Sequence, residues 1–157
     1  MTIKTSTDLI SQYAHTQTTD DVDYCFRTRV ARFVLPADAA ASTATDNYLF
    51  TGIKACKLVS ARVLPSAAVT ADDTNYATLA LGPYTLSSGA IGTAYDSILT
   101  KITGGTGNWT AGVAEDFTIV TATDVCAVTQ GIALKVTKAG TGVALPRLTV
   151  EIEYRLD

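Results

Sequence analysis

The sequence predicts an all-β fold, an antiparallel jelly-roll-like sandwich or barrel. Short apolar runs alternate with turn residues along most of the chain, which gives about seven or eight candidate strands. Thr and Val are abundant, and both are stiff at the first side-chain torsion and fit a pleated surface better than a helix. Strands do not alternate with helices, so a parallel sheet is not indicated. At 157 residues the chain fits one domain with a sizeable core.

Residues 1–23 are expected to form an extended N-terminal arm, followed by a single β-sandwich domain over residues 24–157. Most of the arm is polar. The apolar residues between its polar runs are Leu9, Ile10 and Tyr13. The arm either frays, as many chain termini do, or becomes ordered against a neighbouring subunit with these three side chains as anchors.

The candidate strands follow the arm in order, and each ends at a turn signal. Their expected ranges are 24–35, 48–52, 55–64, 76–81, 117–121, 132–137 and 147–156. Pro36 and Pro65 follow the first and third strands, because proline cannot donate to a strand ladder. Gly82 and Pro83 are expected to close the fourth strand. Small and polar residues over 36–47 predict a loop.

Residues 94–102 are the one segment with helical spacing. Its apolar residues fall at positions i, i+3, i+4 and i+7, namely Tyr95, Ile98, Leu99 and Ile102. Thr93 and Asp96 have the spacing of a capping box. The segment therefore predicts one short helix. A strand is the alternative, because the segment is short for a helix so rich in Thr.

The final candidate strand has the clearest alternation in the chain. The residues predicted to face the core are Leu148, Val150, Ile152, Tyr154 and Leu156. Burying five such side chains contributes on the order of 10 kcal/mol gross. A shift of one residue would turn two glutamates inward, so the register is strongly specified. The strand is therefore expected to be central or well covered.

Composition and charge exclude several classes of function. Only 17% of the residues are charged, which is typical of a protein inside an assembly and also fits a β-rich monomer covered by Thr. The net charge is −3 and no basic run is present, so nucleic acid is not expected as a direct partner. No apolar run approaches the roughly 18 residues of a membrane span. The first residues lack the apolar core of a signal peptide, which predicts synthesis in a cytoplasm.

No catalytic, cofactor-binding or metal-binding group is predicted. The single histidine, His15, lies in the arm without a structured partner for acid–base chemistry. Cys25, Cys56 and Cys126 are widely spaced and form no Cys-x-x-Cys pair, so they are expected to be small buried apolar residues. The aspartates at 72–73 match no dedicated calcium loop, and turn formation through hydrogen bonds to their own backbone is the favoured interpretation.

Residues 104–112 form a glycine-rich turn around the one tryptophan. The run Gly-Gly-Thr-Gly lacks the Lys-Ser/Thr pair of a phosphate loop, so conformational freedom in a tight turn explains these glycines. Asn108 begins a glycosylation sequon, which would need a secretory route. Trp109 has three interpretations: it closes one end of the core, it stacks on a sugar ring, or it anchors a protein interface.

Three arginines give the first strand a cluster of positive charge. Arg27 and Arg29 share one face of the strand, and Arg32 lies on the other. They either form salt bridges, opposite Glu151 and Glu153 if the first and last strands pair, or dock the protein onto an acidic partner surface. The sequence leaves both interpretations open.

Three motifs resemble those of small virion proteins of tailed bacteriophages. They are Asn-Tyr-Ala-Thr at 75–78, Gly-Gly-x-Gly-Asn-Trp-Thr-Ala-Gly at 104–112, and Lys-Ala-Gly-x-Gly-x-x-x-Pro at 138–146, ahead of the terminal strand. The likeness covers roughly residues 56–154. Such virion proteins include capsid decoration (cement) proteins and other head or fibre components, and the resemblance brings no catalytic residues.

The resemblance implies a capsid decoration protein that binds and stabilises the outer surface of a phage head. The expected partner is the major capsid protein, the expected state is a homo-oligomer with a trimer favoured, and the expected location is the virion, after synthesis in the bacterial host cytoplasm. The residues expected to contact a partner are Leu9, Ile10, Tyr13, Arg27, Arg29 and Trp109. The alternatives are a phage fibre or tail component and a carbohydrate-binding, receptor-binding β-sandwich module. An enzyme is not expected.

Overall fold

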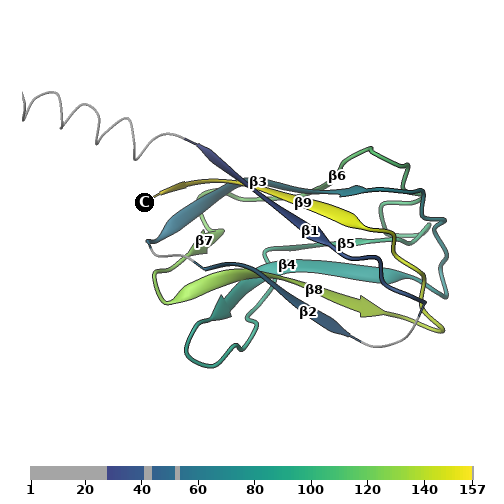
Figure 1. Cartoon of the computed structure of the whole chain (residues 1–157), viewed down its shortest axis with the longest axis horizontal. Coiled ribbons are helices and arrows are strands. Elements are labelled where there is room, and N and C mark those ends of the chain that lie inside the picture. The colour runs from purple at the N-terminus through teal and green to yellow at the C-terminus, as the bar shows by residue number, and fades with distance from the viewer. Residues whose placement is uncertain (1–27, 41–43, 52–53, 157) are drawn as a thin grey trace, which may run out of the picture.

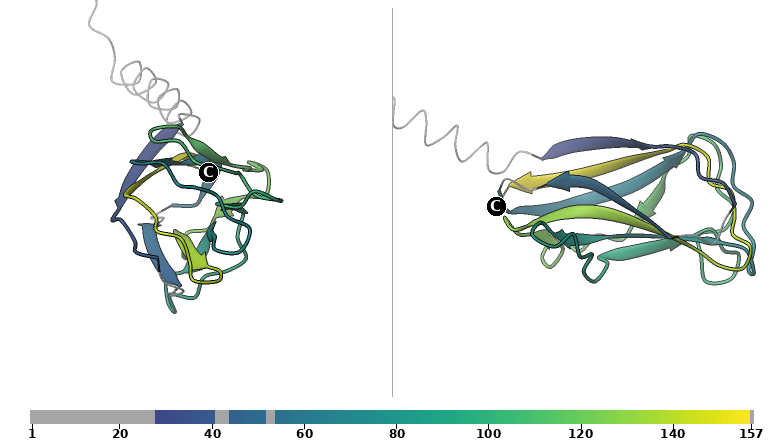
Figure 2. Two further views of the ribbon diagram at one scale, coloured as in Figure 1. Left: turned by 90° about the vertical axis from the view of Figure 1, so that its right-hand side faces the viewer. Right: turned by 60° about the horizontal axis from the view of Figure 1, so that its bottom comes forward.

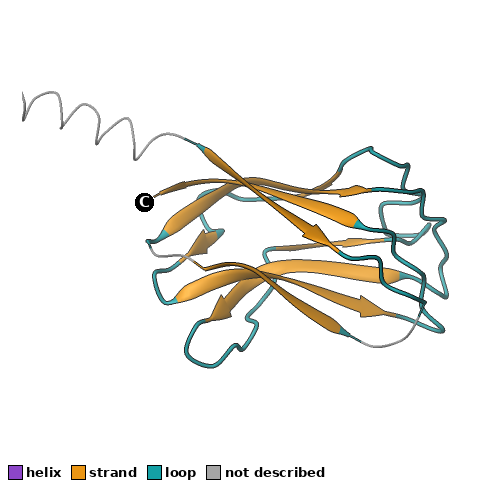
Figure 3. Ribbon diagram, in the orientation of Figure 1, coloured by secondary structure: helices purple, strands orange, loops and turns teal. Residues whose placement is uncertain are grey.

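The computed structural model describes residues 28–40, 44–51 and 54–156 (Figure 1). Within these ranges the regular elements are nine strands and no helix, which confirms the all-β prediction (Figure 3). The strands are β1 (Arg29–Leu35), β2 (Thr45–Thr51), β3 (Cys56–Pro65), β4 (Ala77–Thr85), β5 (Asp96–Leu99), β6 (Glu115–Phe117), β7 (Val125–Cys126), β8 (Gln130–Lys138) and β9 (Leu148–Leu156). The expected arm lies outside the described residues.

The strands form two antiparallel sheets that pack face to face as a sandwich (Figures 1 and 2). One sheet has the order β1-β9-β3-β6, with the short β7 added beside β3, and the other has the order β2-β8-β4-β5. Apart from β7, this is the interleaved order of an eight-stranded jelly roll, in which strands far apart in the chain become neighbours. The order confirms the predicted jelly-roll-like sandwich.

Strand β9 is central in its sheet, as its alternation predicted. It pairs with β1 on one side and with β3 on the other. Leu148, Val150 and Ile152 face the core and are fully buried, whereas Glu151 and Glu153 face outward. An apolar side chain every second residue thus sets the register on both sides of the strand.

The core lies between the two sheets and is built from their inward-facing side chains. Its largest fully buried members are Trp109, Leu58, Leu79, Leu81, Ile132, Leu134, Ile152, Val63 and Val150. Leu79 and Leu81 alternate inward along the expected strand 76–81, and Ile132 and Leu134 along the expected strand 132–137. Phe117 is also buried, and Ile119 packs against the core as a partly buried side chain.

Strand β4 continues through the Gly82-Pro83 pair that was expected to end it. Gly82 pairs with Ala133 and Pro83 with Ile132 of β8, and the strand ends at Thr85. Strand β5 covers β4 only as far as Leu81, so Pro83 sits where the ladder on that side has ended. Its carbonyl accepts a hydrogen bond from the Gly92 N–H at 2.8 Å, on the side away from β8. The missing proline N–H therefore breaks no strand ladder.

The helix expected over residues 94–102 is not formed, and the strand alternative is confirmed as β5 (Asp96–Leu99). A helical face would bury all four apolar residues of that segment, but Ile102 is 65% exposed while Ile98 is buried. Asp96 does not cap a helix, since its carboxylate accepts the N–H of Thr118 at 2.6 Å. Pairing with β4 therefore outweighed the local helical spacing.

Other strand boundaries differ from the expected ranges by a few residues. Strand β2 begins at Thr45, inside the expected loop 36–47, and β6 ends at Phe117 where the expected strand 117–121 begins. Strand β3 includes Pro65 as its last residue, beyond the ladder of β6. The two-residue β7 was not predicted, because two residues carry no periodicity.

Candidate partner-binding surface

The loops after β1, β3, β5 and β8 gather at one end of the sandwich, on the right of Figure 1. This end contains all three motifs that the sequence singles out. The Asn75 carboxamide oxygen accepts hydrogen bonds from the N–H and the hydroxyl of Thr141, at 2.8 and 2.9 Å. The Ala139 N–H donates to the Tyr76 carbonyl at 2.9 Å. The first and third motifs therefore hold each other in place.

The third motif requires glycine at position 140 for two reasons. Gly140 has a φ of 60°, in the left-handed region that favours glycine. A Cβ there would lie 2.4 Å from the Asn75 carboxamide oxygen and 2.7 Å from the Thr74 carbonyl oxygen. The glycine is thus explained by the close approach of the loop that carries Gly140 to the loop that carries Asn75.

The second motif folds around Trp109, whose side chain is 1% exposed. Its indole N–H donates to the Thr106 hydroxyl at 2.7 Å, and its backbone pairs with that of Val69. Gly104 and Gly107 adopt positive φ, which confirms that the glycines serve the turn. Of the three interpretations of Trp109, closing one end of the core is confirmed. In this conformation the ring presents no face to a sugar or to a partner protein.

The aspartates at 72–73 organise backbone turns, as expected. The Asp72 carboxylate accepts the N–H groups of Thr74 and Asn75, each at 2.6 Å. Asp73 accepts the N–H and the hydroxyl of Thr103, and these hydrogen bonds hold the pKa of its carboxyl below the ordinary value. Within the described ranges no three His, Cys, Asp or Glu side chains are grouped to hold a metal ion.

Outward-facing residues of β1 and β3 form a surface that we call the β1 surface. It is made of Val30, Arg32, Val34, Ser60 and Arg62. Val30 and Val34 are 59% and 62% exposed. Strand β1 pairs only with β9 in the described part of the chain, so its other edge is the rim of the sheet. An edge strand with exposed branched apolar side chains is the kind of surface that pairs or packs with another chain.

A carboxylate between two arginines lies in the middle of the β1 surface. Arg32 of β1 approaches one oxygen of Glu151 at 2.6 Å, and Arg62 of β3 approaches the other at 2.7 Å. The hydrogen bond from Arg62, and the charge of Arg32, hold the pKa of Glu151 below the ordinary value of a glutamate. Both guanidinium groups stay largely exposed while the carboxylate is covered. The two guanidinium groups are therefore accessible on the surface, while Glu151 and Glu153 on the same face balance their charge.

Part of the outer face of the second sheet is covered by two tyrosine side chains, of which Tyr48 remains 53% exposed. Tyr48 and Tyr84 contact edge to face with ring centroids 4.7 Å apart, and the Tyr48 hydroxyl donates to the Gly89 carbonyl at 3.1 Å. Beneath them Ala133 is fully buried, and Gly131 and Tyr84 are buried too. Ala133 and Gly131 on this face are therefore shielded from solvent, whereas Val30 and Val34 on the other outer face are exposed.

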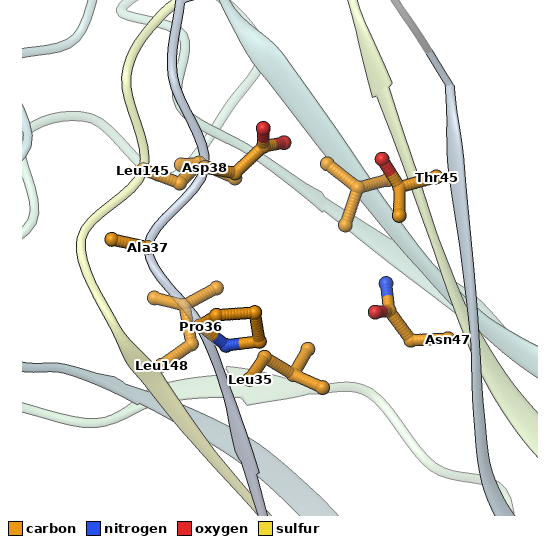
Figure 4. Close-up of a pocket in the computed structure, with 9 residues that line it drawn as sticks. Leu35, Pro36, Ala37, Asp38, Thr45, Asn47, Leu145 and Leu148 are labelled. Carbon is orange, nitrogen blue, oxygen red and sulfur yellow. The ribbon is translucent and has the colours of Figure 1, made fainter.

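A pocket of about 140 Å³ opens between the end of β1 and the start of β2 (Figure 4). Leu35, Pro36 and Asp38 line one side and Thr45 and Asn47 the other. The side chains of Asn47 and Asp38 have partners within the protein. The Asn47 carboxamide nitrogen donates to the Leu134 carbonyl, and the Asp38 carboxylate lies 2.9 Å from the buried Lys138 ammonium. Lys138 also donates to the Ala39 carbonyl. Through these contacts, the segment that follows β1 in the first sheet is linked to β8 in the second sheet.

Only part of the expected contact set can be placed. Leu9, Ile10, Tyr13 and Arg27 lie outside the described residues, as do His15 and Cys25. Arg29 is half-buried in β1 opposite Tyr154, and Arg32 lies on the other face as predicted. The salt-bridge interpretation is confirmed for Arg32, because it pairs with Glu151. Arg62, Val30 and Val34 were not predicted as contact residues, because the surface that they form depends on which strands become neighbours.

No protein-family model matches the chain. No curated protein matches it either. Among solved structures, the chain is similar to one of infectious bursal disease virus, Gx strain, at 12% identity and a TM-score of 0.37, and to one of the Gt strain at 10% and 0.32. The matches cover 85% and 83% of this chain and 37% of each viral chain. This chain thus spans little more than a third of those chains.

A search for membrane-spanning helices among the described residues finds none of sufficient length and hydropathy.

Proposed function

We propose that this protein is a structural component of a virion, and that it acts as a decoration protein on the outer surface of a phage head. The observation that carries the proposal is the β1 surface, on which exposed valines and arginines lie beside the rim of the first sheet. A surface of this kind serves binding and not chemistry. The three motifs that resemble phage virion proteins support the same role.

The jelly roll narrows the alternatives without deciding among them, because one fold serves several functions. Virus coat domains, lectins and cupins share this architecture. A metal-dependent cupin chemistry would draw on imidazole ligands, and His15 is the one histidine of the chain. The carbohydrate-binding alternative placed Trp109 against a sugar ring, and Trp109 is buried. A coat or assembly role requires neither histidine ligands nor an aromatic ring that stacks on a sugar.

The proposed partner is the major capsid protein, with the protein bound as a homo-oligomer, for which we favour a trimer. Arg32 and Arg62 on the β1 surface would contact acidic groups on the shell, and Val30 and Val34 would be buried against it. Leu9, Ile10 and Tyr13 precede β1 in the sequence, and we propose that they add contacts to the shell.

The binding of purified protein to emptied phage heads, measured by co-sedimentation, tests the proposal. We expect Val34→Glu to weaken binding at least tenfold, because it places a carboxylate where an apolar side chain should be buried. Val128→Glu is the matched control, since Val128 is 56% exposed but lies outside the β1 surface. Equal binding by both variants would refute the assignment of the β1 surface.

The copy number of the chain in purified virions, relative to the major capsid protein, tests the location on the head. Quantitative mass spectrometry should give a ratio near one for a decoration protein that covers the shell. A handful of copies per particle would instead place the protein at a vertex, fibre or tail, which is the main alternative.

A further inference from the structure

The thiols of Cys56 and Cys126 face each other across the pairing of β3 with β7. The two residues are direct partners in the antiparallel register. Such partners have Cα atoms about 4.5–5.5 Å apart, inside the 4.4–6.8 Å range of protein disulfides. Both side chains are buried, and both cysteines are in the reduced, thiol form in this structure. The register thus places the pair at a Cα spacing that a disulfide can bridge.

We propose that Cys56 and Cys126 form a cross-strand disulfide when the protein meets a low-molecular-weight disulfide such as oxidised glutathione. One protein thiolate attacks the glutathione disulfide and forms a mixed disulfide, and one reduced glutathione leaves. The second protein thiolate then attacks the protein sulfur of that mixed disulfide and releases the second reduced glutathione. The two protein thiols lose two electrons and two protons, and one glutathione disulfide is reduced to two thiols.

The disulfide would lock β7 to β3 within one sheet, next to the point where the chain crosses to the other sheet. Cys56 begins β3 in one sheet, whereas Cys126 lies four residues before the start of β8 in the other. The link closes a loop of about 70 residues that contains β4, β5 and β6. Constraining so long a loop in the unfolded chain predicts a large gain in thermal stability. The proposal is independent of the proposed function.

The native packing slows the reaction, and the opening of β7 acts as its gate. The hydrogen bond with Cys56, and burial, raise the pKa of the Cys126 thiol, so little thiolate forms while β7 is closed. Strand β7 is two residues long and is held by the Tyr95 hydroxyl, which donates to the Val125 carbonyl at 2.6 Å. The Leu58 N–H also donates to the Asp124 carbonyl at 3.0 Å. Opening of these bonds exposes the thiols.

The test uses the full chain carrying Cys25→Ser, so that two cysteines remain. After incubation with oxidised glutathione, peptide mapping by mass spectrometry should find the peptides of Cys56 and Cys126 joined. The oxidised protein should melt about 10 °C higher than the reduced protein. Glutathione adducts on both cysteines, or thiols that stay free after brief exposure in mild urea, would overturn the proposal. So would an unchanged or lower melting temperature of the linked protein.

The rate of oxidation tests the gate. Tyr95→Phe removes the hydrogen bond to Val125 and should speed formation of the disulfide about fivefold. Tyr48→Phe is the matched control, because it removes a tyrosine–backbone hydrogen bond at the other sheet and should leave the rate unchanged. Equal rates in the two variants would overturn the gating role of Tyr95.

Discussion

The Arg32 guanidinium and the Glu151 carboxylate lie 2.6 Å apart across the β1–β9 pair. Arg62 of β3 takes the second carboxylate oxygen from the other side, so one glutamate joins three adjacent strands. The register places Asp116 of β6 opposite Arg62, which extends the row of charges. The pairing order β1-β9-β3-β6 thus places residues of alternating charge side by side across the outer face of the sheet.

Lowering the pH should destabilise the protein through Glu151. Its pKa is lower in the folded state than in the unfolded chain, so its contribution is present above the unfolded pKa of about 4.5 and is lost as the pH falls through the folded pKa. Glu151→Gln should cost about 1 kcal/mol at pH 7, because both arginines are largely exposed to solvent. Its melting temperature should depend less steeply on pH between 3 and 5 than that of the wild type.

Glu153→Gln is the matched control for this prediction, because Glu153 lies on the same strand and face but opposite Val30 and Ser60. It should retain the acid-induced loss seen in the wild type. Asp73, whose pKa is also lowered, supplies a share of that loss in every variant. A Glu151→Gln profile parallel to the wild type between pH 3 and 5 would contradict the role of the cluster.

The sequence carried most of the sheet architecture because burial acts on alternate residues. Leu148, Val150 and Ile152 predicted a central strand, and β9 lies between β1 and β3. The error at 94–102 arose because Tyr95 and Ile98 fit a helical face as well as a strand. Pairing with β4 decides between the two, and that partner is distant in the chain.

The candidate surface was harder to predict because it depends on which strands become neighbours. A salt bridge between Arg32 and Glu151 was one of the two interpretations that the sequence left open. Arg62 carried no separate signal, because its position beside Glu151 follows from the β3–β9 pairing. The contact of Cys56 with Cys126 depends in the same way on β7, which is too short to show a pattern.

Gly131→Ala should destabilise the protein by about 1–3 kcal/mol. A Cβ at this position would lie 2.4 Å from both the Phe50 carbonyl oxygen and a ring carbon of Tyr84. Relieving these contacts would require the backbone of β2 to move. Gly92→Ala is the control, since its Cβ would meet only ordinary contacts with Pro83 at 3.5 Å. Urea denaturation followed by circular dichroism compares the two, and equal stabilities would argue against the tight packing over Gly131.

Asn75→Ala should loosen the end of the sandwich where the motifs meet. It removes the acceptor for the N–H and the hydroxyl of Thr141, at a cost of about 1–3 kcal/mol. Thr141→Ala removes only the hydroxyl bond and should cost less. Amide hydrogen exchange should show faster exchange at Thr141 in the Asn75→Ala protein, and unchanged protection there would contradict the role of Asn75.

Trp109→Ala should cost about 3–5 kcal/mol in unfolding free energy, because it empties a core position at the loop end. Thr106→Val keeps the ring in place but removes the acceptor of the indole N–H, so a loss of about 1 kcal/mol is expected. Thr110→Val, next to the ring in sequence and exposed, should be close to neutral. Urea denaturation followed by circular dichroism measures all three.

The fluorescence of Trp109 in the wild type should resist quenching by iodide and should not change when sugars are added. A sugar-dependent change in that emission would favour the carbohydrate-binding alternative, since Trp109 is the one tryptophan of the chain.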